Sequence, residues 1–177
     1  MRICVYCSSS DGVNPSFKRL ASDFGKWLAT EGHTLVYGGA TGGLMTAVAE
    51  SAFSNGGQVI GVIPPSVEKK GRKAPWPITF YEVSDLGERK KVMKEYADLF
   101  VVLPGSFGTM DEMLDTMAAG ILGEHNKPMI MVNADGFFDH FLMLVERMKK
   151  EGMLSDCVYS YYVADNLQEC ISLIKNI

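Results

Sequence analysis

Residues 104–112 read PGSFGTMDE and combine a glycine-rich turn with acidic side chains. The turn follows the apolar run LFVVL at 99–103 and precedes a segment with helical character that begins at Thr109. If the helix starts within residues 106–108, its first backbone amides and the Thr109 hydroxyl can cradle a phosphate, because N–H groups at a helix N-terminus are unpaired and the dipole favours anions. Glu112 would then lie one turn farther on and could address another part of the same ligand.

A second glycine-rich segment, YGGATGGLM at 37–45, also follows an apolar run and leads into a helix-like stretch. Its glycines do not have the G-x-G-x-x-G spacing of a dinucleotide-binding turn, and no acidic residue closes the next strand. Neither glycine segment contains the G-K-[ST] of a P-loop. The two segments therefore favour a phosphate-bearing ligand that is neither a dinucleotide nor held by a P-loop.

Arg89 lies in a third segment of interest, the helix-like stretch at 86–97. Arg89, Met93 and Tyr96 recur at helical spacing and share one face of that helix. An arginine on the apolar side of a helix needs an anionic partner if it is buried. A structural salt bridge and a ligand contact both satisfy this requirement, and the residues alone leave the two alternatives open.

The elements that must position these residues alternate along the chain between apolar runs and amphipathic stretches. Strands are predicted at 2–7, 34–38, 58–63, 79–83, 99–103 and 128–132, with a weaker one at 158–163. Helices are predicted at 15–31, 42–55, 86–97, 109–122, 136–151 and 165–175. Three of the helices have predicted caps: Asn14 for the first, Ser84 or Asp85 for the helix at 86–97, and Asp165 for the last, with Glu88 three residues after Asp85 as in a capping box. The proline-rich, charged stretch at 64–78 is predicted to be irregular, either a mobile flap near the site or a surface insertion.

Continuous apolar strands alternating with helices predict an α/β fold. We expect residues 1–177 to form one domain, a Rossmann-like doubly wound, mainly parallel sheet of about seven strands with helices on both faces. Ligands of such sheets bind at the carboxyl ends of the strands, which is where the glycine-rich segments lie.

Composition excludes several classes of function. The net charge of −4 and the short basic clusters give no support for nucleic-acid binding, and no apolar run is long enough to span a membrane. No targeting segment is recognised, and a reducing cytoplasm is expected. Cys4 and Cys7 would point to opposite faces of a strand, so neither a redox pair nor a zinc half-site follows from them. No metal or cofactor is predicted.

The three segments together resemble signatures of a known family. YGGATGGLM (37–45), ERKKVM (88–93) and PGSFGTMDE (104–112) are similar to the GGG-x-x-GLMG, MHERK and PGG-x-GT-x-x-E patterns of the LOG proteins, cytokinin-activating phosphoribohydrolases. The similarity extends over most of the chain. Such proteins were often labelled lysine decarboxylases, but we identify no Schiff-base lysine here. The resemblance implies hydrolysis of the N-glycosidic bond of a nucleoside 5′-monophosphate, such as AMP or an N6-substituted AMP, to a free base and ribose 5-phosphate.

The resemblance also implies roles for individual residues. Glu112 would be the catalytic carboxylate and Arg89 its partner, which orients it and lowers its pKa. A carboxylate can stabilise the oxocarbenium-like ribose and deprotonate the attacking water. The substrate-binding residues implied are Lys90, the phosphate-holding Gly105, Ser106, Phe107, Gly108 and Thr109, the backbone-approach positions Gly38, Gly39, Gly42 and Gly43, together with Ser9 and Glu68.

A homodimer with sites near the subunit interface is implied as well. Met110, Met113 and Met117 form a helical stripe that suits either such an interface or the protein core. The rival interpretation to an enzyme is a non-catalytic nucleotide sensor or carrier on the same fold, which would keep the phosphate turns and release no base.

The chain departs from the family patterns at three positions of interest. Ser106 replaces the second glycine of PGG, where a positive φ would strain it and a negative φ would leave its hydroxyl free to donate. Gly87 replaces the histidine before ERK, so no acid is available there. Ala118 is small, and we expect it to admit a different or bulkier base.

Overall fold

The computed structural model describes residues 1–154 and 159–177. Its strands are β1 (Arg2–Tyr6), β2 (Thr34–Tyr37), β3 (Gln58–Ile63), β4 (Thr79–Glu82), β5 (Leu99–Val102), β6 (Met129–Val132) and β7 (Tyr161–Ala164). Its helices are α1 (Pro15–Thr30), α2 (Gly43–Ser54), α3 (Pro65–Glu68), α4 (Leu86–Tyr96), α5 (Phe107–Ile121), α6 (Asp139–Lys150) and α7 (Leu167–Asn176), with a 3-10 turn at Ala134–Gly136. The predicted start of the last strand, residue 158, and Cys157 lie outside the described residues.

The strands form one seven-stranded sheet in the order β4-β3-β2-β1-β5-β6-β7, and every neighbouring pair is parallel. Successive crossovers run outward in both directions from the central pair of β1 and β5, so the topology changes direction between these two strands. The predicted α/β fold class and the doubly wound parallel sheet are confirmed.

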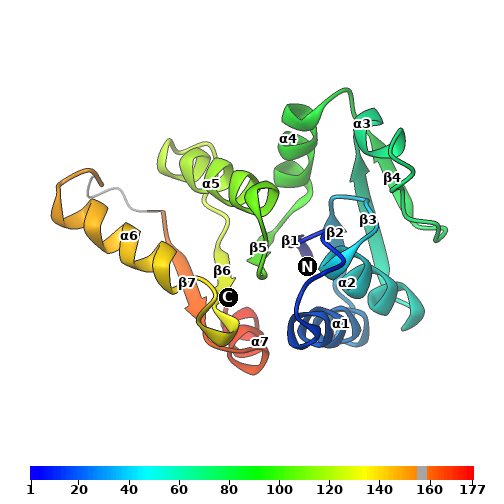
Figure 1. The fold of residues 1–177 in the computed structure, drawn as a ribbon, viewed down its shortest axis with the longest axis horizontal. Helices are drawn as coiled ribbons and strands as arrows, with labels where there is room; N and C mark the ends of the chain where they lie inside the picture. The colour runs from blue at the N-terminus through cyan, green and yellow to red at the C-terminus, as the bar shows by residue number, and fades with distance from the viewer. Residues whose placement is uncertain (155–158) are drawn as a thin grey trace.

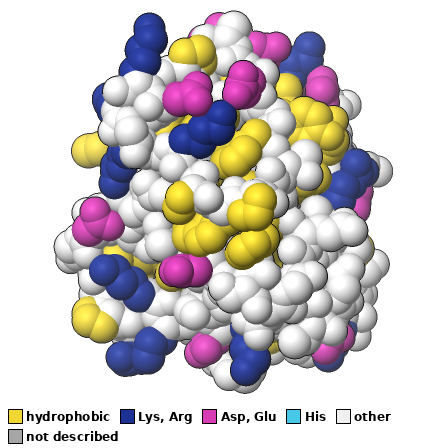
Figure 2. Space-filling model, turned by 90° about the vertical axis from the view of Figure 1, so that its right-hand side faces the viewer, with side chains coloured by type: hydrophobic (Ala, Val, Ile, Leu, Met, Phe, Trp, Pro, Cys, Tyr) yellow, Lys and Arg dark blue, Asp and Glu magenta, His cyan; other side chains and the backbone are white. Residues whose placement is uncertain are grey.

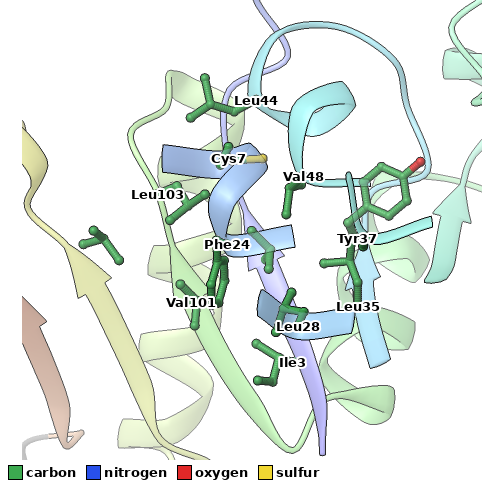
Figure 3. Close-up of a cluster of buried hydrophobic side chains, with 14 of the residues drawn as sticks. Ile3, Cys7, Phe24, Leu28, Leu35, Tyr37, Leu44, Val48, Val101 and Leu103 are labelled. Carbon is green, nitrogen blue, oxygen red and sulfur yellow. The ribbon is translucent and has the colours of Figure 1, made fainter. Parts of the chain in front are cut away.

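Helices cover both faces of this sheet (Figure 1). Helices α1, α2 and α7 pack on one face, and α4, α5 and α6 pack on the other. The first core includes Phe24, Leu28 and Leu44 from the helices together with Ile3 and Leu35 from the sheet. In Figure 3, Leu28 lies toward Ile3 and Leu35, and Leu44 lies at the other end of the cluster. β5 and β6 are buried along their whole length, as strands covered on both faces must be.

The methionine stripe of α5 belongs to the core of the second face. Met113 and Met117 are buried there, and Met110 packs against the same cluster. Cys4 lies in this second core, whereas Cys7 lies in the first, so the two thiols are on opposite sides of the sheet as predicted. Cys4, Cys7 and Cys170 are free and buried.

Helix starts follow the predicted chemistry, with one correction. The Asn14 side chain accepts from the Ser16 amide at 3.0 Å, and Asp85 accepts from the Glu88 amide at 2.9 Å. The predicted Asp165 cap is wrong, because the neighbouring Asn166 caps α7 by accepting from the Glu169 amide. Both residue types favour this position, and the helix begins at Leu167, two residues after the predicted start at 165.

Residues 64–78, which we call the strap, are more ordered than the irregular segment that was predicted. The strap opens with α3 and then runs antiparallel beside the second glycine-rich segment (37–45), with a bridge between Ala40 and Lys73. The Thr41 amide donates to the Arg72 carbonyl at 2.7 Å, and the Ala74 amide donates to the Gly39 carbonyl at 3.1 Å. Figure 2 faces the side of the molecule that carries β4 and α3, where apolar side chains gather among charged ones. The strap is hydrogen-bonded onto the carboxyl end of the sheet.

No described helix is long and apolar enough to cross a membrane. Within residues 1–154 and 159–177, no group of three or more His, Cys, Asp or Glu side chains is placed to hold a metal ion.

Candidate functional site

A cavity of about 360 Å³ lies at the carboxyl ends of the central strands. Its volume is in the range of small-molecule sites. The loop after β1, the start of α2, the strap, the start of α4 and the start of α5 all contribute to its wall. The lining residues are Cys7, Ser9, Ala40, Met45, Val67, Lys70, Arg72, Leu86, Arg89, Ser106, Gly108, Thr109 and Glu112.

A buried ion pair forms one wall of the cavity. Arg89 Nη1 lies 3.4 Å from Glu112 Oε1, and the two residues are only 9% and 5% exposed. α4 and α5, which carry the pair, are tied together nearby because Lys90 Nζ bridges Asp111 at 2.9 Å and Asp115 at 3.3 Å. Of the two alternatives for Arg89, the salt bridge is present, and the pair still faces the cavity.

Backbone carbonyls hold the rest of the Arg89 guanidinium. Nη2 donates to the Gly38 carbonyl at 2.9 Å and Nε donates to the Val62 carbonyl at 3.2 Å. A Cβ at position 38 would lie 1.6 Å from Arg89 Nη2. Gly38 is therefore a glycine because a guanidinium occupies the space beside it. Arg89 is fixed on three sides and has little freedom to turn away from Glu112.

The electrostatics of Glu112 correct one expectation. Burial raises the pKa of this carboxyl from its ordinary 4.5 to about 7, and the opposing influence of the Arg89 charge is smaller. Arg89 lowers the pKa of Glu112 as predicted, but burial raises it by more, so the expectation that Arg89 keeps this carboxyl fully ionised is wrong. A carboxyl with a pKa near 7 exchanges protons readily at neutral pH, which is what general acid–base chemistry requires.

The N-terminus of α5 presents unused donors to the same cavity. Ser106 is the N-cap but its side chain makes no capping bond, and the described residues supply no acceptor to the amides of Phe107, Gly108 and Thr109. Ser106 has a φ of −102°, so serine is unstrained there and its hydroxyl is free to donate. A Cβ on Gly105 would lie 2.0 Å from Thr109 Oγ1, which explains the glycine. The helix begins at Phe107, inside the predicted window.

The second glycine-rich segment is different, because the protein itself satisfies its amides. The Gly43 amide donates to Asp11 Oδ1 at 3.0 Å, the Gly42 amide donates to Thr46 Oγ1 at 2.7 Å, and the Leu44 amide donates to the Ser8 carbonyl at 2.9 Å. No donor at the start of α2 is left for a phosphate. Gly42 and Gly43 line a neighbouring cavity of about 510 Å³.

Of the remaining predicted site residues, some lie at the cavity and others lie on the protein surface. Ser9 lines the cavity. Gly39, with a φ of 69°, packs against the backbone of β3. The Phe107 side chain is 93% exposed and does not line the cavity. Glu68 pairs with Lys73 at 3.0 Å, and neither Glu68 nor Lys90 is part of the cavity wall.

The other two departures from the family patterns, Gly87 and Ala118, do not line the cavity. Leu86 lines the cavity mouth, while the adjacent Gly87 has only Asp85 near it. Ala118 is exposed on α5 and does not line the cavity, so in the described chain it has no contact with the space where a base would lie.

Several lining residues were not predicted. Lys70 and Arg72 come from the strap, and Met45 and Leu86 come from the first turns of their helices. The apolar residues have no chemical signature in the sequence. The basic residues of the strap gave no signal by their type, and the feature that could have identified Arg72 is its position in a long segment that follows a strand end.

The fold and the site define a Rossmann-like α/β protein with an arginine–carboxylate pair and an open helix N-terminus at the carboxyl ends of its strands. Residues 45–174 match the family model described as "Possible lysine decarboxylase". The chain is 38% identical over 171 residues to the probable cytokinin riboside 5′-monophosphate phosphoribohydrolase LOG4 of Oryza sativa subsp. japonica, covering 96% of this chain and 74% of that protein. The chain belongs to the LOG family.

Two further similarities describe the family and the fold. The cytokinin riboside 5′-monophosphate phosphoribohydrolase LOG, also of Oryza sativa subsp. japonica, is 39% identical over 155 residues, which span 88% of this chain and 64% of that protein. The structure of the molybdenum cofactor binding protein from Rippkaea orientalis superposes with a TM-score of 0.73 at 21% identity, covering 99% of this chain and 95% of that one. At that identity the likeness concerns the fold alone.

Proposed function

We propose that the protein hydrolyses the N-glycosidic bond of nucleoside 5′-monophosphates, AMP or N6-substituted AMP, to the free base and ribose 5-phosphate. The observation that carries this proposal is the buried Arg89–Glu112 pair in the same cavity as the unpaired amides at the start of α5. The printed names of the rice relatives, cytokinin riboside 5′-monophosphate phosphoribohydrolases, support the same reaction class.

The phosphate binds at the start of α5. The amides of Phe107, Gly108 and Thr109 and the hydroxyls of Ser106 and Thr109 supply donors, and the helix dipole favours the dianion. This anchorage orients the sugar toward Glu112, which lies in the second turn of the same helix. One rigid element therefore binds the non-reacting phosphate and carries the reacting carboxylate.

Glu112 performs the chemistry. As the bond between C1′ and the base nitrogen breaks, its electron pair leaves with the base and the ribose takes on oxocarbenium character. The ionised Glu112 stabilises this cation and accepts a proton from the water whose oxygen bonds to C1′. Glu112 then gives this proton to the departing base, so the base leaves neutral and the carboxylate is ionised again. Arg89 orients the carboxylate, and water is the only co-reactant.

We also propose a homodimer. The outer face of α5 exposes Phe107, Leu114, Ile121 and, just beyond the helix, Leu122. The first three recur every seven residues and so form one stripe, which a second copy of the chain would cover. Because Phe107 adjoins the cavity, the interface would lie beside the site. Light scattering should give a dimer, and Leu114→Asp with Ile121→Asp should give a monomer.

The free, buried thiols Cys4, Cys7 and Cys170 are consistent with a reducing compartment. We propose the cytoplasm as the location, and a fluorescent fusion observed in intact cells would test it.

The reaction is tested by incubating the purified protein with a panel of nucleoside monophosphates and measuring the free base. We expect release from AMP, with loss in Glu112→Ala and Arg89→Ala of about 100- to 10,000-fold in kcat. Glu146→Ala and Arg147→Ala, exposed residues on α6, are matched controls and should turn over normally. Unchanged turnover in the Glu112 or Arg89 variant would remove the assignment, and tight AMP binding without release by the unmodified protein would favour a carrier.

A further inference from the structure

We infer that Arg72 of the strap is a specificity-determining residue that binds the phosphate of the substrate. The inference rests on the proposed function, since it deepens the description of the same cavity. Arg72 lines that cavity together with Ser106, Gly108 and Thr109. None of the three family signatures includes Arg72, and it comes from a different part of the chain than the other phosphate-binding groups.

The backbone of Arg72 is fixed at the rim of the cavity. Its carbonyl accepts from both the amide and the hydroxyl of Thr41, at 2.7 and 3.2 Å. The next residue, Lys73, secures the outer side of the strap through ion pairs of 3.0 Å to Glu68 and to Glu82. Side chains of neighbouring residues in an extended segment point in opposite directions, so Lys73 is directed outward and Arg72 inward.

The guanidinium of Arg72 also has a position prepared for it. Nη2 donates to the Ser9 carbonyl at 2.9 Å. A Cβ at position 42 would lie 2.4 Å from this Nη2 and 2.2 Å from the Ser9 oxygen, and Gly42 has a φ of 113°. A side chain at position 42 would therefore displace the guanidinium. Gly42 makes room for Arg72 as Gly38 makes room for Arg89.

The charge of the cavity calls for such a residue. The start of α5 offers hydrogen bonds and a partial charge, but a phosphate dianion also needs a full positive charge nearby. Among the described lining residues, Arg89 is paired with Glu112, and the remaining cations are Lys70 and Arg72. Lys70 is an exposed, flexible side chain at the rim.

Arg72 suits this role better than Lys70. Among the described residues, Arg72 pairs with one carboxylate, the exposed Asp11, whose Oδ2 lies 4.0 Å from Nη2. This separation is too long for a hydrogen bond, so the guanidinium donors that do not face Ser9 remain available. A guanidinium can bind two phosphate oxygens at once in a planar geometry. The strap would thus supply the charge and α5 the directed donors, and a nucleoside without phosphate would gain nothing from either.

The experiment compares AMP with adenosine in the full chain. Arg72→Ala should weaken AMP binding, measured by calorimetry, and raise KM by about 10- to 100-fold, while kcat and adenosine binding remain unchanged. Arg72→Lys should recover part of the loss because it keeps the charge. Lys69→Ala removes an exposed cation from the same strap outside the cavity and should change neither ligand.

Equal weakening of AMP and adenosine, or no weakening of AMP, in Arg72→Ala would overturn the inference. A thermal melt checks that the variant is folded, which we expect because backbone atoms make the contacts to Thr41. If the unmodified protein binds AMP in an Arg72-dependent way but releases no base, the proposed reaction fails and the role of Arg72 stands. A protein that binds no nucleoside monophosphate would overturn both.

Discussion

The two glycine-rich turns of this protein have similar sequences and different physical roles. In the turn before α5, the first amides of the helix are unpaired and face a cavity that contains Glu112. In the turn before α2, Asp11, Thr46 and the Ser8 carbonyl already accept from the corresponding amides. One helix start is open to an anion, whereas the other is closed by the protein's own oxygen atoms.

The difference shows that the glycines of such a turn can leave space for a ligand or for a neighbouring side chain of the protein. Gly38 and Gly42 of the closed turn give space to Arg89 and Arg72, both of which line the cavity. The closed turn therefore contributes to the cavity indirectly, by giving space to two arginines, while the open turn contributes its unpaired amides.

The largest expected effect tests the indirect role of the closed turn. Gly38→Ala places a methyl group on the Arg89 guanidinium and should misplace it relative to Glu112, with a loss of about 100-fold in kcat. Steady-state kinetics with AMP measure this effect. Gly12→Ala is the matched control, since a Cβ there meets nothing within 4 Å. Normal kcat in Gly38→Ala would show that the guanidinium position is unimportant.

The second prediction concerns the carboxyl beside the open turn. The pKa of Glu112 is raised from 4.5 to about 7, so the folded protein keeps a proton that the unfolded chain has lost. The stabilisation from this group is complete below pH 4.5 and is lost as pH rises through about 7. The free energy of unfolding, relative to Glu112→Gln, should fall by about 1–3 kcal/mol between these limits.

Urea unfolding at several pH values measures the difference between the two proteins. The glutamine variant is the reference for the unmodified protein because its side chain at position 112 cannot titrate. A difference that does not depend on pH, or that grows as pH rises, would show that Glu112 is ionised throughout and that the Arg89 charge outweighs burial.

The third prediction tests whether Gly108 in the open turn is a glycine because of the ligand or because of neighbouring protein atoms. A Cβ on Gly108 would meet no atom within 4 Å, and alanine favours the helix by up to about 1 kcal/mol. Gly108→Ala should therefore be at least as stable as the unmodified protein. Its methyl group would occupy space needed by phosphate, and KM for AMP should rise roughly 10-fold. An unchanged KM would place the phosphate elsewhere.

The smallest expected effect concerns the acceptor that closes the α2 turn. Asp11→Ala removes the cap from the Gly43 amide and should lower the free energy of unfolding by about 0.5–1 kcal/mol. Calorimetry should still give one AMP per chain with undiminished affinity. Asp23→Ala, on the exposed side of α1, is the control for loss of an acid. A large loss of AMP affinity would mean that the closed turn contacts the ligand after all.

Much of the fold could be predicted because the pattern of apolar runs determines it directly. Each predicted strand and helix appears, with ends displaced by a few residues, and Asn166 replaces Asp165 because adjacent residues are both good caps. The four-residue α3 was not predicted, since a single helical turn has no periodicity to recognise. The ordered structure of the strap depends on its backbone hydrogen bonds to the turn before α2. These bonds join segments distant in the chain, so no local sequence pattern predicts them.

The part of the candidate site that could be predicted is the part encoded in one short motif, which contains both the helix start and the carboxylate. Residues 104–112 contain the helix start and Glu112, and helical spacing places Arg89 on the inner face of α4. The contact of Arg72 with Ser9 joins residues far apart in the chain, and the pKa of Glu112 depends on the depth of its burial. Both properties come from the assembled structure. The sequence therefore indicated the lowering of the Glu112 pKa by Arg89 but not the larger, opposite effect of burial, and it indicated no role for Arg72.

The fit between Gly38 and Arg89 also bears on how members of this family can diverge. Position 38 has an ordinary backbone conformation, so the guanidinium accounts for its glycine. A descendant that loses Arg89 would be released to accept alanine or serine at position 38, whereas one that keeps Arg89 would not. The two positions should therefore change together in evolution, and a chain with a larger residue at position 38 would mark a branch that has given up this chemistry.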